Sequence, residues 1–195
     1  LNFFCHLQPE FDAAREANWR AQLSKYYDEY GIDPEFPSSI GMFPIDDAMC
    51  DLIVALRPEV VSFHFGLPDG SILARIKATG AAILSSATTV REAVFLEENG
   101  CDAVIAQGAE AGGHRGMFLA TDISGQVGTL SLVPQIADAV RIPVIAAGGI
   151  AVARGIAAAF ALGAVGVQIG TAYLRCNESK INPLHRERLR TSSAD

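Results

Sequence analysis

The sequence predicts an α/β fold made of parallel βαβ units, either a doubly wound sheet or a (β/α)8 TIM barrel. Short apolar runs alternate with helical patterns along the chain. The runs show no polar alternation, as expected for strands of a parallel sheet. A barrel needs roughly 250 residues, and the chain has 195. Six strands fit either fold, and an incomplete barrel with about six of its eight βα units would account for the shortfall in length.

Six apolar runs are the predicted strands. The first opens the chain as Leu-Asn-Phe-Phe-Cys, and the second is stopped by Gly66 and Pro68. The third, fourth and sixth each follow a glycine that ends a helical pattern, and the fifth ends in two glycines. The strands are predicted at residues 1–5, 60–65, 82–86, 103–106, 143–147 and 166–170.

The predicted helices lie between these strands. Asp46 and Thr88 or Thr89 are suitable N-caps, and Gly80 is a suitable helix end. The first helix is polar and carries Trp19, Tyr26 and Tyr27, which we expect to pack against other residues. A loop with three prolines follows at residues 31–44. The helices are predicted at residues 12–30, 46–57, 71–79, 89–99, 132–140 and 151–162.

Composition excludes several classes of function. The net charge of -7 argues against nucleic acid or an anionic membrane surface as a partner. The four cysteines are far apart and form no C-x-x-C pair, so we expect neither a metal site nor a disulfide framework. No apolar run could span a bilayer, and no basic-then-apolar leader opens the chain. We expect a cytoplasmic protein that is part of a longer chain.

The loop after the fourth strand is the strongest candidate site. Gly112, Gly113 and Gly116 flank His114 and Arg115. Glycine lets the backbone turn sharply near a ligand, and loops at the carboxyl ends of strands carry function in barrels. An imidazole titrates near neutral pH and can take a proton from carbon. The alternative is a solvated His-Arg pair on the surface.

Two glycine turns predict an anion site. Gly148 and Gly149 follow the fifth strand, and Gly170 and Thr171 end the sixth. Loops after the last strands of a barrel often hold a phosphate, which is bound by backbone amides and a helix N-terminus. The alternative is two ordinary turns. Neither turn reads G-x-G-x-x-G, so a dinucleotide fingerprint is absent from the sequence.

Three further polar residues lie at strand ends. Gln107 and Gln168 carry amides that both donate and accept, which suits the edge of a heterocycle. His64 lies between two phenylalanines near the end of the second strand. It is either a ligand-facing residue or a hydrogen-bonded core residue. The serines near these strands have no His-Asp partner pattern, so a hydrolase triad is not supported.

Six segments in order carry a resemblance to a known family. They are residues 2–6 (Asn-Phe-Phe-Cys-His), 61–68 (Val-Ser-Phe-His-Phe-Gly-Leu-Pro), 84–89 (Leu-Ser-Ser-Ala-Thr-Thr), 107–116, 146–150 (Ala-Ala-Gly-Gly-Ile) and 168–172 (Gln-Ile-Gly-Thr-Ala). Together they resemble the nitronate monooxygenase family, formerly called 2-nitropropane dioxygenases. The resemblance covers nearly the whole chain.

The resemblance implies one FMN-binding TIM-barrel domain over residues 1–195, without the family's amino-terminal strands and carboxyl-terminal region. It assigns catalysis to His114, with His64 as a second histidine that faces the flavin. Gly148, Gly149, Gly170 and Thr171 would hold the phosphate. The remaining cofactor contacts would come from Asn2, Gln107, Gly112, Ala147 and Gln168.

The implied reaction is oxidation of an alkyl nitronate, such as propionate 3-nitronate, by O2 to a carbonyl compound and nitrite. The expected partners are a nitronate or nitroalkane and O2, and a homodimer is an open alternative. Two other functions remain open. One is a related FMN barrel reductase that uses NAD(P)H, for enoyl-acyl-carrier protein or quinone. The other is a non-catalytic barrel fragment.

Overall fold

The computed structural model describes residues 1–8, 10–33 and 43–191 of the chain. These residues form two compact units. The first unit comprises residues 1–6 and 45–195 and contains the whole sheet. The second comprises residues 7–44 and contains helix α1 (Ala13–Tyr30). The candidate site belongs entirely to the first unit.

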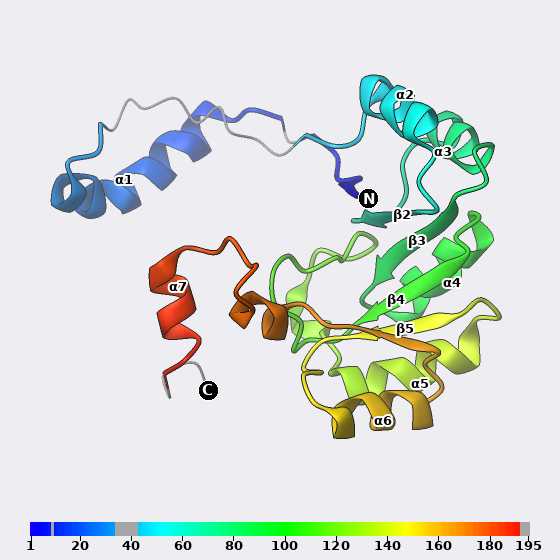
Figure 1. Ribbon diagram of the computed structural model, residues 1–195. Coiled ribbons are helices and arrows are strands. Elements are labelled where there is room, and N and C mark those ends of the chain that lie inside the picture. The colour runs from blue at the N-terminus through cyan, green and yellow to red at the C-terminus, as the bar shows by residue number, and fades with distance from the viewer. Residues whose placement is uncertain (9, 34–42, 192–195) are drawn as a thin grey trace. The chain divides into compact units, whose positions relative to one another are not determined.

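A single parallel sheet forms the first unit, and its six strands are arranged in chain order (Figure 1). In a doubly wound sheet the order reverses at a switch point, and helices cover both faces. Here the order never reverses, and helices α2 to α6 lie on one side of the sheet, as in a barrel wall. The strands are β1 (Asn2–Phe4), β2 (Val60–His64), β3 (Ala82–Ala87), β4 (Ala103–Gln107), β5 (Val144–Ala147) and β6 (Gly166–Gln168).

The helices begin where the sequence offers caps. The Asp46 carboxylate accepts a hydrogen bond from the backbone N–H of Met49 at 2.8 Å and starts α2. Thr89 starts α4 in the same way. The helices on the sheet are α2 (Asp47–Leu56), α3 (Gly70–Lys77), α4 (Val90–Glu98), α5 (Thr129–Ala139) and α6 (Ala153–Ala161). Shorter turns of helix are η1 (Ile123–Gly125), η2 (Thr171–Arg175) and α7 (Pro183–Arg188).

The hydrophobic core lies between these helices and the sheet. The largest fully buried apolar side chains come from α2, β2, α3, β3, α4 and α5. Burying one such side chain contributes about 1.5–3 kcal/mol. The members include Ile53, Phe63, Ile76, Ile83, Leu96, Leu132 and Ile136.

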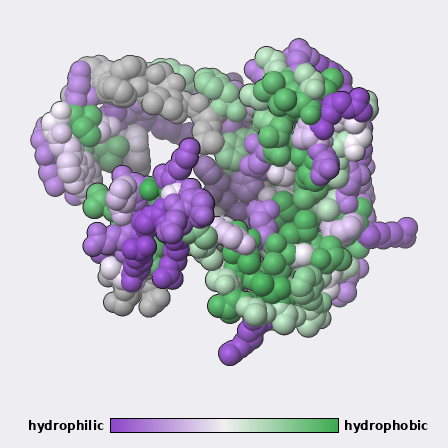
Figure 2. Space-filling view, in the orientation of Figure 1, coloured by the Kyte–Doolittle hydropathy of each residue, from purple (hydrophilic) through white to green (hydrophobic). Residues whose placement is uncertain are grey.

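The sheet does not close on itself, because β1 and β6 each pair with a neighbour on one side. The predicted incomplete barrel is therefore confirmed, and the doubly wound alternative is wrong. Figure 2 shows hydrophobic side chains gathered over the region of β5, α5 and α6. Phe160 of α6 and Val165 before β6 are 50% and 64% exposed. In a closed barrel the next βα unit covers this position.

Two details differ from the sequence predictions. Helix α5 begins at Thr129 rather than at residue 132, because the carboxylate of Glu110 caps it from a distant loop. In the second unit, α1 has no buried residue, and Trp19 is 57% exposed. Tyr26 is also exposed, whereas Tyr27 is half-buried, so the expected packing is not observed for Trp19 and Tyr26. Part of the predicted loop 31–44 lies outside the described residues.

Within the described ranges, no helix combines the length and the apolar character needed to cross a membrane.

Candidate active site

A pocket of about 1050 Å³ opens at the carboxyl ends of the strands. Its size is that of a site for a large ligand. Every residue that the sequence predicted for catalysis or cofactor binding lines this one pocket: Asn2, His64, Gln107, Gly112, His114, Ala147, Gly148, Gly149, Gln168, Gly170 and Thr171. Their individual roles remain predictions.

Strand register explains why these side chains share a face. Gln107 lies beside Ala147, and Ala147 lies beside Gln168, so one row crosses β4, β5 and β6. At the opposite edge of the sheet, where β1 pairs with β2, Phe4 lies beside His64. Neighbours in register point to the same face of a parallel sheet. The row of Gln107, Ala147 and Gln168 therefore forms the floor of the pocket.

The turn after β5 requires glycine. Gly148 has a φ of +119° and Gly149 a φ of +66°. A Cβ atom on Gly148 would lie 2.8 Å from Thr129 Oγ1 and 2.9 Å from the backbone nitrogen of Ala111. Side chains are strained at such φ values. This turn therefore has no side chains, and the backbone of both glycines lines the pocket.

Unused amide donors gather beside this turn. In the part of the chain that the structure describes, no intramolecular hydrogen bond uses the backbone N–H of Gly149, Gly170 or Thr171. Helix α6 also begins there without a side-chain cap. A Cβ atom on Gly112 would lie 2.9 Å from Thr171 Oγ1, so the loop after β4 closes on the same place. Amide donors and a helix N-terminus suit a phosphate.

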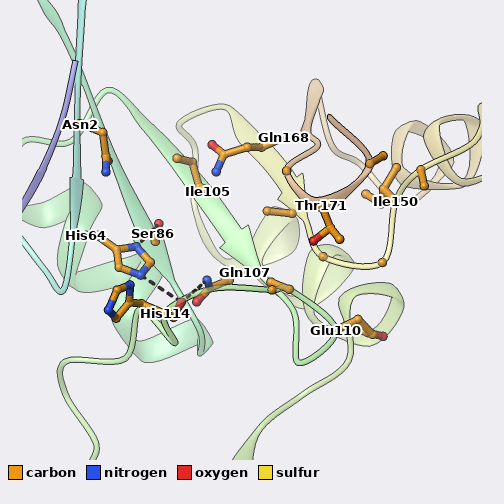
Figure 3. A pocket seen from close by; sticks show the side chains of 18 of the residues that line it. Asn2, His64, Ser86, Ile105, Gln107, Glu110, His114, Ile150, Gln168 and Thr171 are labelled. Carbon is orange, nitrogen blue, oxygen red and sulfur yellow. Dashed lines mark hydrogen bonds between the residues drawn. The ribbon is translucent and has the colours of Figure 1, made fainter. Parts of the chain in front are cut away.

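The two histidines lie toward the other end of the pocket, with Gln107 between them and Thr171 (Figure 3). Nδ1 of His64 is 3.0 Å from Oγ of Ser86, and Nε2 is 3.2 Å from the backbone oxygen of His114. The amide of Gln107 donates to the same oxygen at 2.8 Å. Burial lowers the pKa of His64, as does the nearby His114 ring, although the hydrogen bond to the His114 backbone opposes this. His64 is therefore neutral at pH 7.

The imidazole of His114 has a different environment. It is exposed, and no hydrogen bond among the described residues uses its ring nitrogens. Its ring meets Phe4 edge-on at a centroid distance of 5.2 Å and Phe65 at 6.0 Å. The two aromatic rings fix one side of the imidazole. Its nitrogens therefore remain available to a ligand.

Arg115, the residue after His114 in this loop, does not line the pocket. Its guanidinium donates to the backbone oxygen of Gly108 at 2.5 Å, and Glu92 and Glu110 act on it electrostatically. Burial lowers its pKa despite these two carboxylates. Arg115 therefore stabilises the loop through its hydrogen bond to the Gly108 backbone. His185, on α7, is exposed and lies outside the pocket lining.

Sequence reasoning missed Glu110 and Thr129. The Glu110 carboxylate lines the pocket and accepts hydrogen bonds from the backbone N–H and the hydroxyl of Thr129, both at 2.8 Å. Burial alone would raise its pKa, but these bonds and the charge of Arg115 together lower it. The carboxylate thus caps α5 and links the His114 loop to the start of that helix, where Thr129 Oγ1 also lies 3.0 Å from the backbone oxygen of Gly148. No local pattern signals a contact across 19 residues.

Glu92 was also missed, although it holds the far end of the same loop. Its side chain is fully buried on α4. One carboxylate oxygen accepts the backbone N–H groups of Phe118 and Leu119 at 2.7 and 3.1 Å. The other accepts the N–H and the hydroxyl of Thr88, both at 2.7 Å. This single carboxylate therefore anchors the His114 loop to β3 and α4.

Replacement of Glu92 by leucine is expected to reduce the free energy of unfolding by about 3 kcal/mol, because several buried donors lose their acceptor. Urea unfolding measures this loss. Glu98→Leu on the exposed face of the same helix is the control and should change stability by less than about 0.5 kcal/mol. Equal losses in the two variants would contradict the anchoring role of Glu92.

Among the described residues, no group of three or more His, Cys, Asp or Glu side chains is placed to hold a metal ion. The four cysteines are free, and Cys176 is exposed. Burial raises the pKa of Cys5 to about 12 and that of Cys101 to about 11. Both thiols are therefore protonated at neutral pH and unreactive.

The fold and the pocket define a class: an incomplete barrel in which two glycine turns and an imidazole line one pocket at the carboxyl ends of the strands. The family model described as nitronate monooxygenase matches residues 1–195. The chain belongs to the nitronate monooxygenase family.

Curated relatives and solved structures agree with this membership. The chain is 42% identical over 193 residues to a nitronate monooxygenase of Paraburkholderia phytofirmans, covering 97% of this chain and 52% of the relative. A nitronate monooxygenase of Pseudomonas aeruginosa is 42% identical over 192 residues, covering 97% and 55%. The chain therefore spans about half the length of the curated relatives it matches.

A nitroalkane oxidase structure from Streptomyces ansochromogenes superposes with a TM-score of 0.86 and 38% identity, covering 98% of this chain and 55% of that one. FabK from Thermotoga maritima superposes with a TM-score of 0.64 and 31% identity, covering 91% and 53%. These likenesses support the barrel assignment.

Proposed function

We propose that the pocket binds FMN and that the protein oxidises alkyl nitronates with O2 to a carbonyl compound and nitrite. One observation carries the proposal: the glycine turns and the His114 imidazole line a single pocket at the carboxyl ends of the strands. Family membership supplies the reaction type. Because the chain spans about half of its relatives, the activity is proposed for the whole protein. A single FMN-binding domain, a cytoplasmic location and a homodimer are predictions of the same kind.

The residues present fit FMN. At one end, the bare backbone of Gly148 and Gly149 and the unused N–H groups near Thr171 match a phosphate dianion. Along the floor, Gln107 and Gln168 offer amides to the ring edge and the ribityl chain. Asn2, Gly112 and Ala147 complete the lining. The two ends of the pocket thus match the two ends of an elongated cofactor.

When bound, the flavin supplies the redox chemistry, taking electrons from the substrate and passing them to O2. The protein's own residues bind and orient. His114 presents ring nitrogens that no hydrogen bond from another described residue engages, so it orients a nitronate anion or removes the α-proton of a neutral nitroalkane. Phe4 and Phe65 hold its ring edge-on. The side-chain amide of Gln107 donates a hydrogen bond to the backbone oxygen of His114, and this contact orients the imidazole toward the pocket.

A second candidate is an FMN barrel reductase that uses NAD(P)H. The structural similarity to FabK, with 31% identity over 91% of this chain, is the observation that favours this second candidate. Both candidates need the same cofactor, so only the electron donor separates them.

The experiment is a visible spectrum after FMN is added, followed by anaerobic titration. We expect protein-bound flavin absorbance that bleaches with propionate 3-nitronate and persists with NADH. Bleaching by NADH alone would favour the reductase. A colourless protein that binds no FMN would contradict both and favour the non-catalytic fragment.

A further inference from the structure

We propose that Ser86 and His64 form a positioning pair: Ser86 holds the ring of His64 in place, and His64, as the Nε2–H tautomer, fixes the backbone that carries the catalytic imidazole of His114. The kinetic part of this inference rests on the proposed function. The tautomer part does not, since it follows from hydrogen bonds within the chain. His64 is thereby a positioning residue, and His114 alone carries the proton chemistry.

The hydrogen-bonding partners of His64 determine its tautomer. The partner of Nε2 is the backbone oxygen of His114, which can only accept, so Nε2 must carry a hydrogen. A neutral imidazole then has a bare Nδ1, which accepts from the hydroxyl of Ser86 at 3.0 Å. Ser86 is 5% exposed, and Nδ1 of His64 is its hydrogen-bond partner. Both ring nitrogens of His64 are thus occupied, and neither can take a proton from a substrate.

The backbone oxygen of His114 receives two donors from two strands. His64 at the end of β2 donates at 3.2 Å, and Gln107 at the end of β4 donates at 2.8 Å. The side-chain oxygen Oε1 of Gln107 also accepts a hydrogen bond from the backbone N–H of Gly116 at 2.7 Å. Ser86 on β3 contributes indirectly, because its hydroxyl bonds to Nδ1 of His64. Residues on three adjacent strands therefore fix the peptide groups on both sides of Arg115.

Close packing explains why the loop has glycine at position 116. A Cβ atom there would lie 2.7 Å from Cε1 of His64 and 3.2 Å from the side-chain Oε1 of Gln107. Gly116 thus lets His64 and Gln107 approach the loop backbone together. The loop is otherwise rich in glycine and needs such external restraint. A catalytic group displaced by about 1 Å can lose about 100-fold in rate.

The first test reads the tautomer directly. Nitrogen NMR of protein labelled with ¹⁵N-histidine, recorded at pH 7 with FMN bound and without it, should show His64 as the Nε2–H tautomer. Ser86→Ala should keep this tautomer but shift the Nδ1 resonance, because the bare Nδ1 loses the hydroxyl that donates to it. Ser85→Ala is the matched control, because Ser85 is the adjacent buried serine and its hydroxyl lies 2.7 Å from the backbone oxygen of Gly66. A wild-type Nδ1–H tautomer, or a signal unchanged in Ser86→Ala, would overturn the inference.

The second test uses conservative rescue in the FMN-loaded protein. Leucine at position 64 removes the donor to the His114 carbonyl, so His64→Leu should lower kcat about 100-fold with little change in KM. Glutamine cannot transfer a proton, but its side-chain amide can donate a hydrogen bond to the His114 carbonyl. The kcat of His64→Gln should therefore be at least tenfold higher than that of His64→Leu. Equal loss in both variants would make His64 a proton-transfer residue. If wild-type protein oxidises no nitronate, the proposed function fails, and the tautomer test alone decides this inference.

Discussion

Gly148→Ala is expected to weaken FMN binding about 100-fold, since a side chain at a left-handed φ costs roughly 1–3 kcal/mol. Gly148 has a φ of +119°, and its new Cβ atom would meet Thr129 Oγ1 at 2.8 Å. To relieve the contact, the turn must shift and move its amides away from the phosphate. Fluorescence titration of FMN measures the change.

Gly80→Ala is the control for this variant. Gly80 also has a positive φ, +88°, but a Cβ atom there would meet nothing within 4 Å. It ends α3 and does not line the pocket. The control should lower stability while FMN affinity stays within about twofold of wild type, which is less than 0.5 kcal/mol. Similar weakening in both variants would show that loss of stability, and not the phosphate turn, controls FMN binding.

His114→Asn is expected to retain FMN and to lose turnover of neutral nitroalkanes by about 10²–10⁴-fold, the usual contribution of a general base. An amide cannot take up the α-proton. Oxidation of a preformed nitronate should fall less, because that substrate has already lost its proton. The ratio of the two rates, measured by nitrite release, therefore reports the proton step.

His185→Asn is the control for His114→Asn, because His185 is exposed on α7 and lies outside the pocket lining. It should leave both rates unchanged. Unchanged turnover of neutral nitroalkanes in His114→Asn would remove His114 from the proton-abstraction role. Loss of bound FMN in that variant would instead make it a cofactor-binding residue.

The order of the elements was predictable because local chemistry specifies it. Asp46 and Thr89 cap helices in the structure as their sequence context predicted. Gly80, Gly100 and Gly163 end helical patterns and adopt the positive φ values expected of such ends. The family resemblance favoured a barrel, but the alternation of strands and helices did not, because a barrel and a doubly wound sheet have the same alternation. Only strand pairing separates them.

The candidate site was predictable to the extent that it follows strand ends. Parallel strands place their carboxyl ends at one edge, so polar residues at those ends converge. The supporting contacts were not predictable, because each joins residues far apart in the chain. Glu110 meets Thr129 and Glu92 meets Phe118 through tertiary packing. The engagement of both nitrogens of His64 likewise depends on Ser86 and the loop backbone.

The central claim is that backbone amides at the two glycine turns hold the phosphate of a flavin whose ring lies toward His114. The affinity of FMN compared with riboflavin tests it most directly, because riboflavin has the same ring and ribityl chain but no phosphate. We expect FMN to bind at least 100-fold more tightly, about 2.7 kcal/mol, in a fluorescence titration at low salt. Equal affinity for the two flavins would contradict the claim.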